Sequence, residues 1–434
     1  MARHAGKRPA LSVPDTGSAP GSRHAQRKPF GHVRQQVATA LLGIVVFLAS
    51  FTGIAVARLQ GNIGVHDINE LLGDDRPTRH GSDDDGIEAP GDPASGEAIN
   101  LLVFGIDARD EPGMTAEGGT RTDVTMLMHI SADRDRVELI SIPRDTLVDI
   151  PDCPLPDGRR TAPQAQSMFN SAFFFGSQTG DLGGGAACTV LTVEAWTGIR
   201  IDDFVLVDFN GFQAMVDSLG GVPMYIPEPI SDSRAHLEIE ETGCQLLDGH
   251  DALGYARARY NIFGSDGSDI ARIGRQQELV AAIAREALTT RILTDPAAMF
   301  QFLDATTRTL ETGSWIGSLT TMAGLGLSLD VDPADIRFAT MPNMPWPQNP
   351  NRVVATAEAE EMWAAVREDR PIDADIDGTG DEAPEPEPED TDVPEDTDVP
   401  DDEVPEVDET PTQPEAEEPD VDDGAPRVCT RADV

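Results

Sequence analysis

Arginines gather in one short stretch of an acidic chain. The formal net charge of the 434 residues is -45, yet the segment 254–277, GYARARYNIFGSDGSDIARIGRQQ, contains Arg257, Arg259, Arg272 and Arg275. A guanidinium presents planar, paired donors that match the oxygens of a phosphate. The clustering therefore has two interpretations, which are ordinary surface charge and a site for a strongly anionic ligand.

Two further segments combine arginine with aspartate near the ends of apolar runs. They are GIDARDEPGMTAEGGTRTD (105–123) and SIPRDT (141–146). Their candidate residues are Asp107, Arg109, Arg121, Asp123, Arg144 and Asp145. Ligands of open α/β sheets bind beyond the carboxyl ends of strands. Since Mg²⁺ combines one or two carboxylates with phosphate oxygens and water, the pattern predicts a site for a pyrophosphate and a divalent cation.

Simpler interpretations apply to each motif taken alone. A single Arg–Asp pair beside a strand is commonly a surface ion pair that contributes little stability. The joint occurrence of three such segments is harder to explain in that way. Residues 97–370 contain no GxSxG, no HExxH and no Walker A lysine motif, and GDLGGG (180–185) is not followed by GK[ST]. We interpret the glycine-rich stretch as a flexible loop.

The surrounding pattern predicts an α/β domain with a central sheet, because apolar strand runs alternate with amphipathic helical stretches. The expected strands cover 99–104, 125–130, 137–142 and 204–209, with a helix starting in FQAMVDSLGG directly after the last of them. Further helices are expected over 189–197, 275–291, 296–311 and 356–367. The globular domain is placed at 97–370.

The N-terminal region resembles a membrane anchor. Residues 1–36 carry seven Lys/Arg against one Asp, and 37–57 are uncharged and mostly apolar, about the length of a membrane-spanning helix. The positive-inside rule puts the leader in the cytoplasm and the domain outside. A cleaved signal peptide ending at AVA (55–57) is the alternative. The acidic residues 58–96 are expected to be a linker.

The C-terminal region is expected to be disordered. Residues 371–434 carry 26 Asp/Glu against two Arg, a net charge of -24, with an acidic proline repeat at 389–405. Such a composition cannot bury enough apolar surface to fold. No region after the leader is basic, which argues against a nucleic-acid partner.

Four cysteines lie in the expected extracytoplasmic part of the chain. In that setting disulfides are favoured over metal ligands, and the spacing contains no CxxC pair. We expect Cys153 to pair with Cys188. A second pair, Cys244 with Cys429, would have to tie the tail back to the domain, and the sequence leaves it open.

Taken together, these segments resemble the LytR-CpsA-Psr (LCP) family of cell-wall phosphotransferases. The resemblance covers about 97–370 and rests on NLLVFGIDAR, TRTDVTMLMHI, SIPRDT, VDFNGFQAMVDSLGGV, LDGHDALGYARAR and DIARIGRQQ, in that order. It implies a mixed central sheet flanked by helices, with an apolar groove for a lipid tail. It also implies transfer of a glycopolymer from a polyprenyl-pyrophosphate carrier to peptidoglycan, with release of polyprenyl phosphate, in a Gram-positive type of envelope.

The resemblance assigns roles to individual residues. Asp107 and Asp123 would hold Mg²⁺, either could accept the proton of the attacking hydroxyl, and Asp145 would orient an arginine. Arg144 and Arg275 would take part in catalysis by stabilising the charge on the leaving phosphate. The residues expected around the pyrophosphate are Arg109, Arg121, Arg144, Arg257, Arg259, Arg272 and Arg275, with Gln276 or Gln277 adding polar contacts.

One position departs from the family pattern. Members commonly have a lysine in a KxN segment, where this chain has Met168 before Asn170. Arg159 or Arg160 could compensate, and Phe173, Phe174 and Phe175 could line the lipid groove, although core packing explains at least two of these three equally well.

The sequence leaves two alternatives to the transferase open. One is a hydrolase that releases glycan phosphate from the same donor to water. The other is a non-catalytic scaffold that binds polyprenyl pyrophosphate, which the methionine favours and the full set of aspartates and arginines opposes. The polymer and the acceptor sugar are not specified by the sequence.

Overall fold

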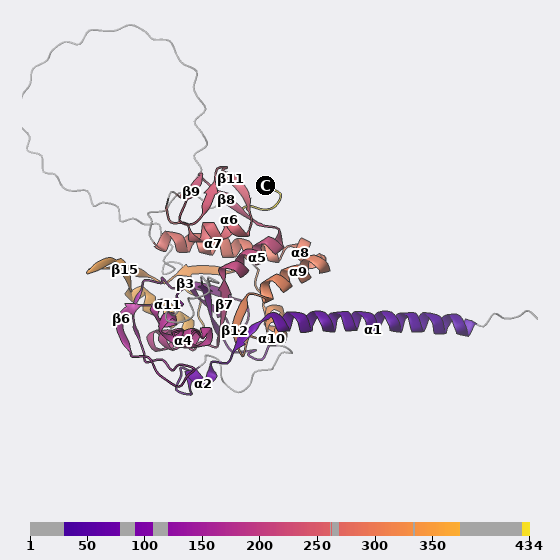
Figure 1. Cartoon of the computed structure of the whole chain (residues 1–434), viewed down its shortest axis with the longest axis horizontal. Helices are drawn as coiled ribbons and strands as arrows, with labels where there is room; N and C mark the ends of the chain where they lie inside the picture. Colours follow the sequence, from indigo (N-terminus) through magenta and orange to yellow (C-terminus); the bar gives the residue numbers. More distant parts are fainter. Residues whose placement is uncertain are drawn as a thin grey trace, which may run out of the picture. The chain divides into compact units, whose positions relative to one another are not determined.

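The computed structural model describes residues 30–78, 92–106, 120–260, 262, 269–332, 335–373 and 428–434. The chain divides into two compact units, Met1–Ala55 and Val56–Val434, and the second contains the sheet and the candidate site. Figure 1 shows the elements along the chain.

The helices are α1 (Phe30–Asn62), α2 (Asn69–Leu72), α3 (Ser171–Gly176), α4 (Leu182–Thr197), α5 (Phe209–Leu219), α6 (Gly249–Arg257), α7 (Asp269–Ala287), α8 (Thr290–Thr294), α9 (Pro296–Thr307), α10 (Leu319–Ser328) and α11 (Ala357–Arg367). The strands are β1 (Gly64–His66), β2 (Ile99–Ile106), β3 (Thr122–Ile130), β4 (Val137–Ser141), β5 (Leu147–Ile150), β6 (Gln164–Met168), β7 (Asp203–Asp208), β8 (Val222–Ile226), β9 (Ile230–Asp232), β10 (Leu237–Ile239), β11 (Gly243–Leu247), β12 (Leu310–Gly313), β13 (Arg337–Thr340), β14 (Asn343–Trp346) and β15 (Asn349–Ala355).

The centre of the domain is a mixed seven-stranded sheet in the order β1-β12-β7-β2-β3-β4-β13. β2 pairs in parallel with β7, and β4 pairs in parallel with β13, whereas β3 runs antiparallel between β2 and β4. The carboxyl ends of β2, β4, β7 and β13 therefore lie at one edge, together with the start of β3. This confirms the predicted α/β class with a central mixed sheet.

Alternation along β2 shows how the sheet is buried on both faces. Leu102 and Phe104 belong to a core cluster shared with α4 and α11. Leu101 and its neighbour Val103 belong to a cluster shared with α10. Because successive side chains of a strand point to opposite faces, the nearly continuous apolar run of β2 is what a strand between two helical layers requires. α4 and α11 lie on the same side of the sheet (Figure 1).

A third core cluster lies outside the sheet. It is formed by α5, α6, α7 and the two-stranded sheets β8–β11 and β9–β10. α6 packs on both α5 and α7. The third cluster supports the helices whose ends carry the clustered arginines.

The folded domain begins earlier than the sequence predicts. Residues of the expected linker form β1, which pairs in parallel with β12 at the edge of the central sheet. Arg58 and Asn62 both bond to Asp304 on α9, with Arg58 Nε 2.8 Å from the carboxylate. The polar composition of the expected linker did not indicate a strand, because an edge strand needs few apolar residues.

The expected anchor 37–57 is helical and belongs to α1. Among the residues that the structure describes, no helix combines the length and the apolar character that crossing a membrane requires.

Both disulfides are formed. Cys153 bonds to Cys188 on α4, and Cys244 on β11 bonds to Cys429. Arg431 adds to the second attachment, because its guanidinium lies 2.6 Å from Glu286 and donates to the carbonyl of Leu219. Residues 428–434, expected to belong to a disordered tail, are therefore attached to the domain. Residues 371–373 of the same expected tail are described as well, and Ile372 is fully buried in the core. The remainder, 374–427, lies outside the described residues.

A buried carboxylate fixes the turn after β12. Asp203, at the start of β7, accepts hydrogen bonds from the backbone N–H groups of Trp315 and Ile316, each at 2.8 Å, and from that of Phe204. Burial raises the pKa of Asp203 to about 6, because it opposes the charged form more than the N–H donors favour it.

This raised pKa predicts how stability depends on pH. A pKa above the unfolded value means that the stability contribution of Asp203 is complete below about pH 4 and is lost as pH rises through 6. Relative to the wild type, Asp203→Asn should therefore gain up to about 3 kcal/mol of unfolding free energy between pH 4 and pH 7. Urea unfolding across this range measures the difference, and parallel curves for the two proteins would contradict it.

Candidate functional site

A pocket of about 320 Å³ lies at the carboxyl edge of the central sheet. Its wall combines the start of β3, the segment after β4, the ends of α6 and α7, and the β9–β10 turn. It is lined by Asp123, Val124, Arg144, Phe209, Asp232, Arg234, Ala235, Leu253, Ala256, Arg257, Arg259, Tyr260, Arg272 and Gln276. Five of these residues are arginines, which makes the pocket suited to a multiply charged anion.

Asp123 and Arg144 face each other across the sheet edge. The Nη1 atom of Arg144 lies 2.6 Å from Oδ1 of Asp123, and both side chains are partly exposed. β3 and β4 are antiparallel neighbours, so the start of one lies beside the end of the other. Strand pairing thus brings together two residues that the sequence separates by 21 positions.

Asp145 points to two guanidiniums. Its carboxylate lies 3.7 Å from Nε of Arg144 and 3.2 Å from Nη1 of Arg352. The sequence predicts that Asp145 orients an arginine, and these contacts are consistent with such a role. Arg352, on β15, was not a candidate.

Arg257 and Arg259 stand at the exit of α6. Asp248 caps the start of the helix, because its side chain accepts from the N–H of Asp251, and the helix ends where Ala258 turns to extended backbone. The guanidinium of Arg257 lies 5.2 Å from the ring centre of Phe209, the first residue after β7. This stacking directs a cation toward the carboxyl edge of the sheet.

The residues of α7 divide between the pocket and the protein interior. Arg272 lines the pocket and donates to the backbone carbonyl of Asp123 at 3.3 Å. Gln276, one turn later, also lines it and donates to Ala256 at 3.0 Å. The helix therefore contributes one cation and one amide to the wall.

Arg275 and Gln277, which the sequence also places around the pyrophosphate, do not line this pocket. Arg275 is 7% exposed and donates to the carbonyl of Ala258, and its burial lowers the pKa of the guanidinium. Gln277 donates to Ser141, Ala339 and Thr340 at the ends of β4 and β13. At 3.6 residues per turn, neighbouring positions on a helix point about 100° apart, so adjacent polar residues cannot all face one ligand.

The remaining candidates have other surroundings. Arg121 lies 5.2 Å from the ring centre of Phe174, outside the pocket lining. Asp107 and Arg109 lie outside the described residues. The end of β2 just before them, at Ile106, pairs with Thr122 beside Asp123.

Met168 ends β6 and pairs with Leu147 of β5. The backbone N–H of Asn170 donates to the carbonyl of Arg144 at 3.2 Å, so this segment runs beside the pocket's cation. Arg159 and Arg160 form exposed ion pairs with acids at positions 157 and 152 and do not line the pocket.

The three phenylalanines after Asn170 have different surroundings. Phe173 is fully buried against Phe104 at a ring distance of 5.5 Å, as core packing predicts. Phe174 and Phe175 are partly buried and contact each other edge to face, with ring centres 5.6 Å apart.

Three polar residues of the pocket were not predicted from the sequence. Asp232, Arg234 and Tyr260 line the wall, and the guanidinium of Arg234 lies 4.7 Å from the ring centre of Tyr260. The signal for them was weak, because Arg234 sits in a short polar turn, SDSRA, between two short apolar stretches. Pairing of β9 with β10 forms the turn, and the carboxylate of Asp232 binds it to the backbone that follows α6.

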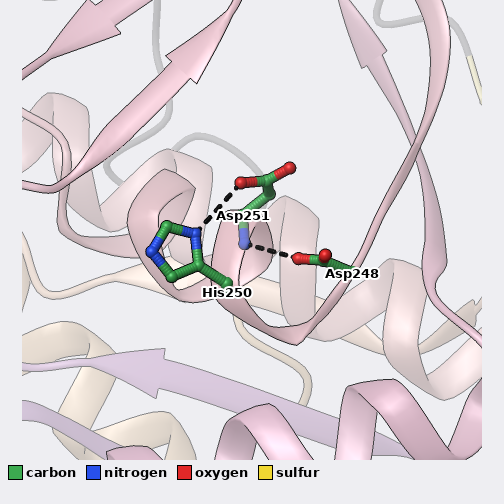
Figure 2. Close-up of side chains that lie close together, drawn as sticks. All are labelled: Asp248, His250 and Asp251. Carbon is green, nitrogen blue, oxygen red and sulfur yellow. Dashed lines mark hydrogen bonds and ion pairs between the residues drawn. The ribbon is translucent and has the colours of Figure 1, made fainter.

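A second polar cluster lies at the opposite end of α6. Asp248, His250 and Asp251 hold their ligand atoms within 4.8 Å of one another, and Figure 2 shows them at the first turn of the helix. Their contacts are those of a helix cap, since Asp248 accepts from the N–H of Asp251 and His250 lies 3.2 Å from Asp251. The cluster does not contribute to the pocket.

Comparisons with known proteins identify the family of the chain. The LytR_cpsA_psr family model matches residues 57–368. The chain is 32% identical over 231 residues to the probable cell wall biosynthesis protein LcpB of Corynebacterium glutamicum, covering 51% of this chain and about half (49%) of that relative. It is also similar to a polyisoprenyl-teichoic acid–peptidoglycan teichoic acid transferase TagU of Halalkalibacterium halodurans. The identity is 28% over 233 residues, which cover 54% of this chain and 67% of that relative.

Among solved structures, a LytR-Csp2A-Psr enzyme from Actinomyces oris has a TM-score of 0.48 at 21% identity, covering 70% of this chain and 95% of that one. The family match extends over most of the chain, including every described residue of the arginine pocket. The chain belongs to the LytR-CpsA-Psr family.

Proposed function

We propose that this protein is a Mg²⁺-dependent phosphotransferase that moves a glycopolymer from a polyprenyl-pyrophosphate carrier onto peptidoglycan. The observation that carries the proposal is the pocket in which five arginines and Asp123 converge at one edge of the sheet. Family membership supports a role in the cell envelope, and a relative named as a teichoic acid transferase supports group transfer to peptidoglycan.

The proposed reaction is a displacement at phosphorus. A sugar hydroxyl of peptidoglycan attacks the phosphorus that bears the glycan, and a new P–O bond forms. The bond from that phosphorus to the bridging oxygen breaks, and polyprenyl phosphate leaves with the electron pair. The hydroxyl proton goes to a carboxylate, for which Asp123 and Asp107 are the candidates.

The arginines supply what this chemistry needs most. Phosphoryl transfer depends on positioning and on neutralising charge more than on covalent help from the protein. Arg144 and Arg272 both contact Asp123, one at its carboxylate and one at its carbonyl, so they surround the proposed metal ligand. Arg257, the last residue of α6, and Arg259, just after the helix, also line the pocket. Guanidiniums from these separate elements can hold both phosphates of the donor.

Among the described residues of the pocket, the carboxylate of Asp123 fits a magnesium ion that is also bound by the donor. Asp123 lines the wall and is partly exposed, whereas both oxygens of Asp232 already accept backbone hydrogen bonds. Asp123, together with Asp107, would hold the ion, and phosphate oxygens and water would complete its ligands. When bound, the ion would neutralise charge on the pyrophosphate.

Membrane attachment is part of the proposal, because a polyprenyl carrier is confined to a membrane. The support is the sequence pattern of a basic leader, the apolar residues 37–57 and an acidic region after them. A fusion of residues 1–60 to a reporter, followed by membrane fractionation, tests it.

The transferase proposal predicts a product that contains a new phosphodiester. The full chain is incubated with Mg²⁺, a short-chain polyprenyl-pyrophosphoryl glycan and a peptidoglycan fragment, and the products are analysed by mass spectrometry. We expect a glycan joined to the fragment through phosphate. Arg144→Ala should lower the rate by about 10²- to 10³-fold, the usual cost of removing one preorganised electrostatic group.

Arg308→Ala is the matched control. Arg308 also forms an ion pair with an aspartate, Asp304, but it lies on the surface at the end of α9. Its variant should retain the full rate. Release of polyprenyl phosphate without a joined product would favour the hydrolase, and tight donor binding without turnover would favour the scaffold.

The two adjacent glutamines of α7 should have separable effects. Gln277→Ala removes three hydrogen bonds to the sheet and should lower the unfolding free energy by about 1–3 kcal/mol, with little effect on pyrophosphate binding at low temperature. Gln276→Ala should weaken pyrophosphate binding with a smaller loss of stability. Urea unfolding and titration calorimetry measure both quantities. The reverse pattern would mean that the pocket has been assigned to the wrong face of α7.

A further inference from the structure

Asp232 joins two separate segments of the pocket wall. Its Oδ1 atom accepts from the backbone N–H groups of Arg234 at 2.9 Å and Ala235 at 3.3 Å. Its Oδ2 atom accepts from the N–H groups of Arg259 at 2.8 Å and Tyr260 at 3.1 Å. Each carboxylate oxygen therefore holds one segment.

The two segments belong to different elements. Arg234 and Ala235 form the turn between β9 and β10, which pair with each other in a sheet of their own. Arg259 and Tyr260 follow α6, after the chain has left helical backbone at Ala258. Strand pairing does not connect the exit of α6 to this turn, so the carboxylate supplies a bond that regular secondary structure does not.

Each segment brings functional groups to the pocket. The turn contributes Arg234, and the exit of α6 contributes Arg259 and Tyr260. The guanidinium of Arg234 packs over the ring of Tyr260 at 4.7 Å, so the contact between the segments depends on their relative placement. A shift of either segment would move a cation relative to the rest of the wall.

The carboxylate is suited to a fixed role. Asp232 is 3% exposed, and although burial raises its pKa, the four N–H donors outweigh that effect and hold the pKa below its usual value. The group is therefore ionised near neutral pH, with its lone pairs occupied by backbone donors. Its charge offsets part of the repulsion among the neighbouring guanidiniums.

We propose that Asp232 is a positioning residue for anion binding, which sets the spacing of Arg234 and Arg259 so that both can contact the pyrophosphate of the donor. The inference rests on the proposed function for the ligand class. Asp232 itself contacts no substrate in this role. It acts by holding backbone, and its loss should affect ligand affinity more than a comparable buried carboxylate elsewhere does.

Titration calorimetry of the full chain with inorganic pyrophosphate tests the inference, using Asp232→Asn. The substitution keeps the size of the side chain, but an amide has only one acceptor oxygen, so its NH₂ group must face one of the two pairs of N–H donors. We expect pyrophosphate affinity to fall by about 10- to 100-fold. The dependence of affinity on salt should also become weaker, because fewer guanidiniums contact the anion.

Asp203→Asn is the matched control. Asp203 is likewise buried and accepts three backbone N–H bonds, but it holds the turn after β12 and does not line the pocket. Its variant should bind pyrophosphate with unchanged affinity and salt dependence. Equal losses in both variants would mean a general effect of stability and would overturn the positioning role.

Hydrogen exchange on the wild-type chain gives a measurement that needs no substitution. The amides of Arg259 and Tyr260 should be protected, and pyrophosphate should increase their protection. Rapid exchange of these amides, or unchanged affinity in a folded Asp232→Asn, would overturn the inference while leaving the proposed function intact. A wild-type chain that does not bind pyrophosphate would instead overturn the proposed function and, with it, the ligand assigned here.

Discussion

Repulsion among converging guanidiniums is the constraint on which the arrangement of the pocket depends. Five arginines line one pocket, and like charges held close together oppose folding unless carboxylates and backbone carbonyls offset them. The structure meets this requirement locally. Asp123 pairs with Arg144, Asp145 lies between two arginines, and Asp232 lies among the cations of α6 and the β9–β10 turn. An anionic ligand with a metal would complete the neutralisation, which is why an unfavourable cluster can be retained as a binding site.

The secondary structure makes this convergence possible with few residues. An antiparallel pair of strands places Asp123 beside Arg144, and a helix that packs across the sheet end adds Arg272 and Gln276. The same helix is held to the sheet by Gln277, whose amide reaches β4 and β13. α7 therefore supports the fold with one face and the pocket with the next. Because Gln276 and Gln277 are adjacent in α7, the position of the pocket wall is linked to that of the strand ends.

The sequence predicted four strands of the central sheet better than the contacts between elements. All four expected strands are present, because their apolar runs are those of strands buried on both faces. The interpretation of GDLGGG (180–185) as a flexible loop was wrong, because its last four residues form the first turn of α4 and the three glycines 183–185 are buried. The edge strand β1 was missed, since pairing with β12 is decided by contacts about 245 residues away in the chain. Within the site, Arg144, Arg257, Arg259 and Arg272 were found from motifs. Asp232 and Arg234 were not, because a two-stranded ribbon of three residues each has almost no periodic signal.

A hydrogen bond at one end and a disulfide at the other attach the acidic C-terminal region to the domain. Ile372 donates its N–H to the buried Glu138 of β4, and Cys429 is bonded to Cys244 of β11. The segment between them is therefore joined to the domain at both ends, whatever its own conformation. The disulfide restricts the segment in the unfolded state as well as in the folded state. Folding of the domain therefore costs less conformational entropy than it would if the segment had a free end. The dense negative charge of residues 374–427 thus belongs to a segment whose two ends are both attached to the domain that carries the arginine pocket.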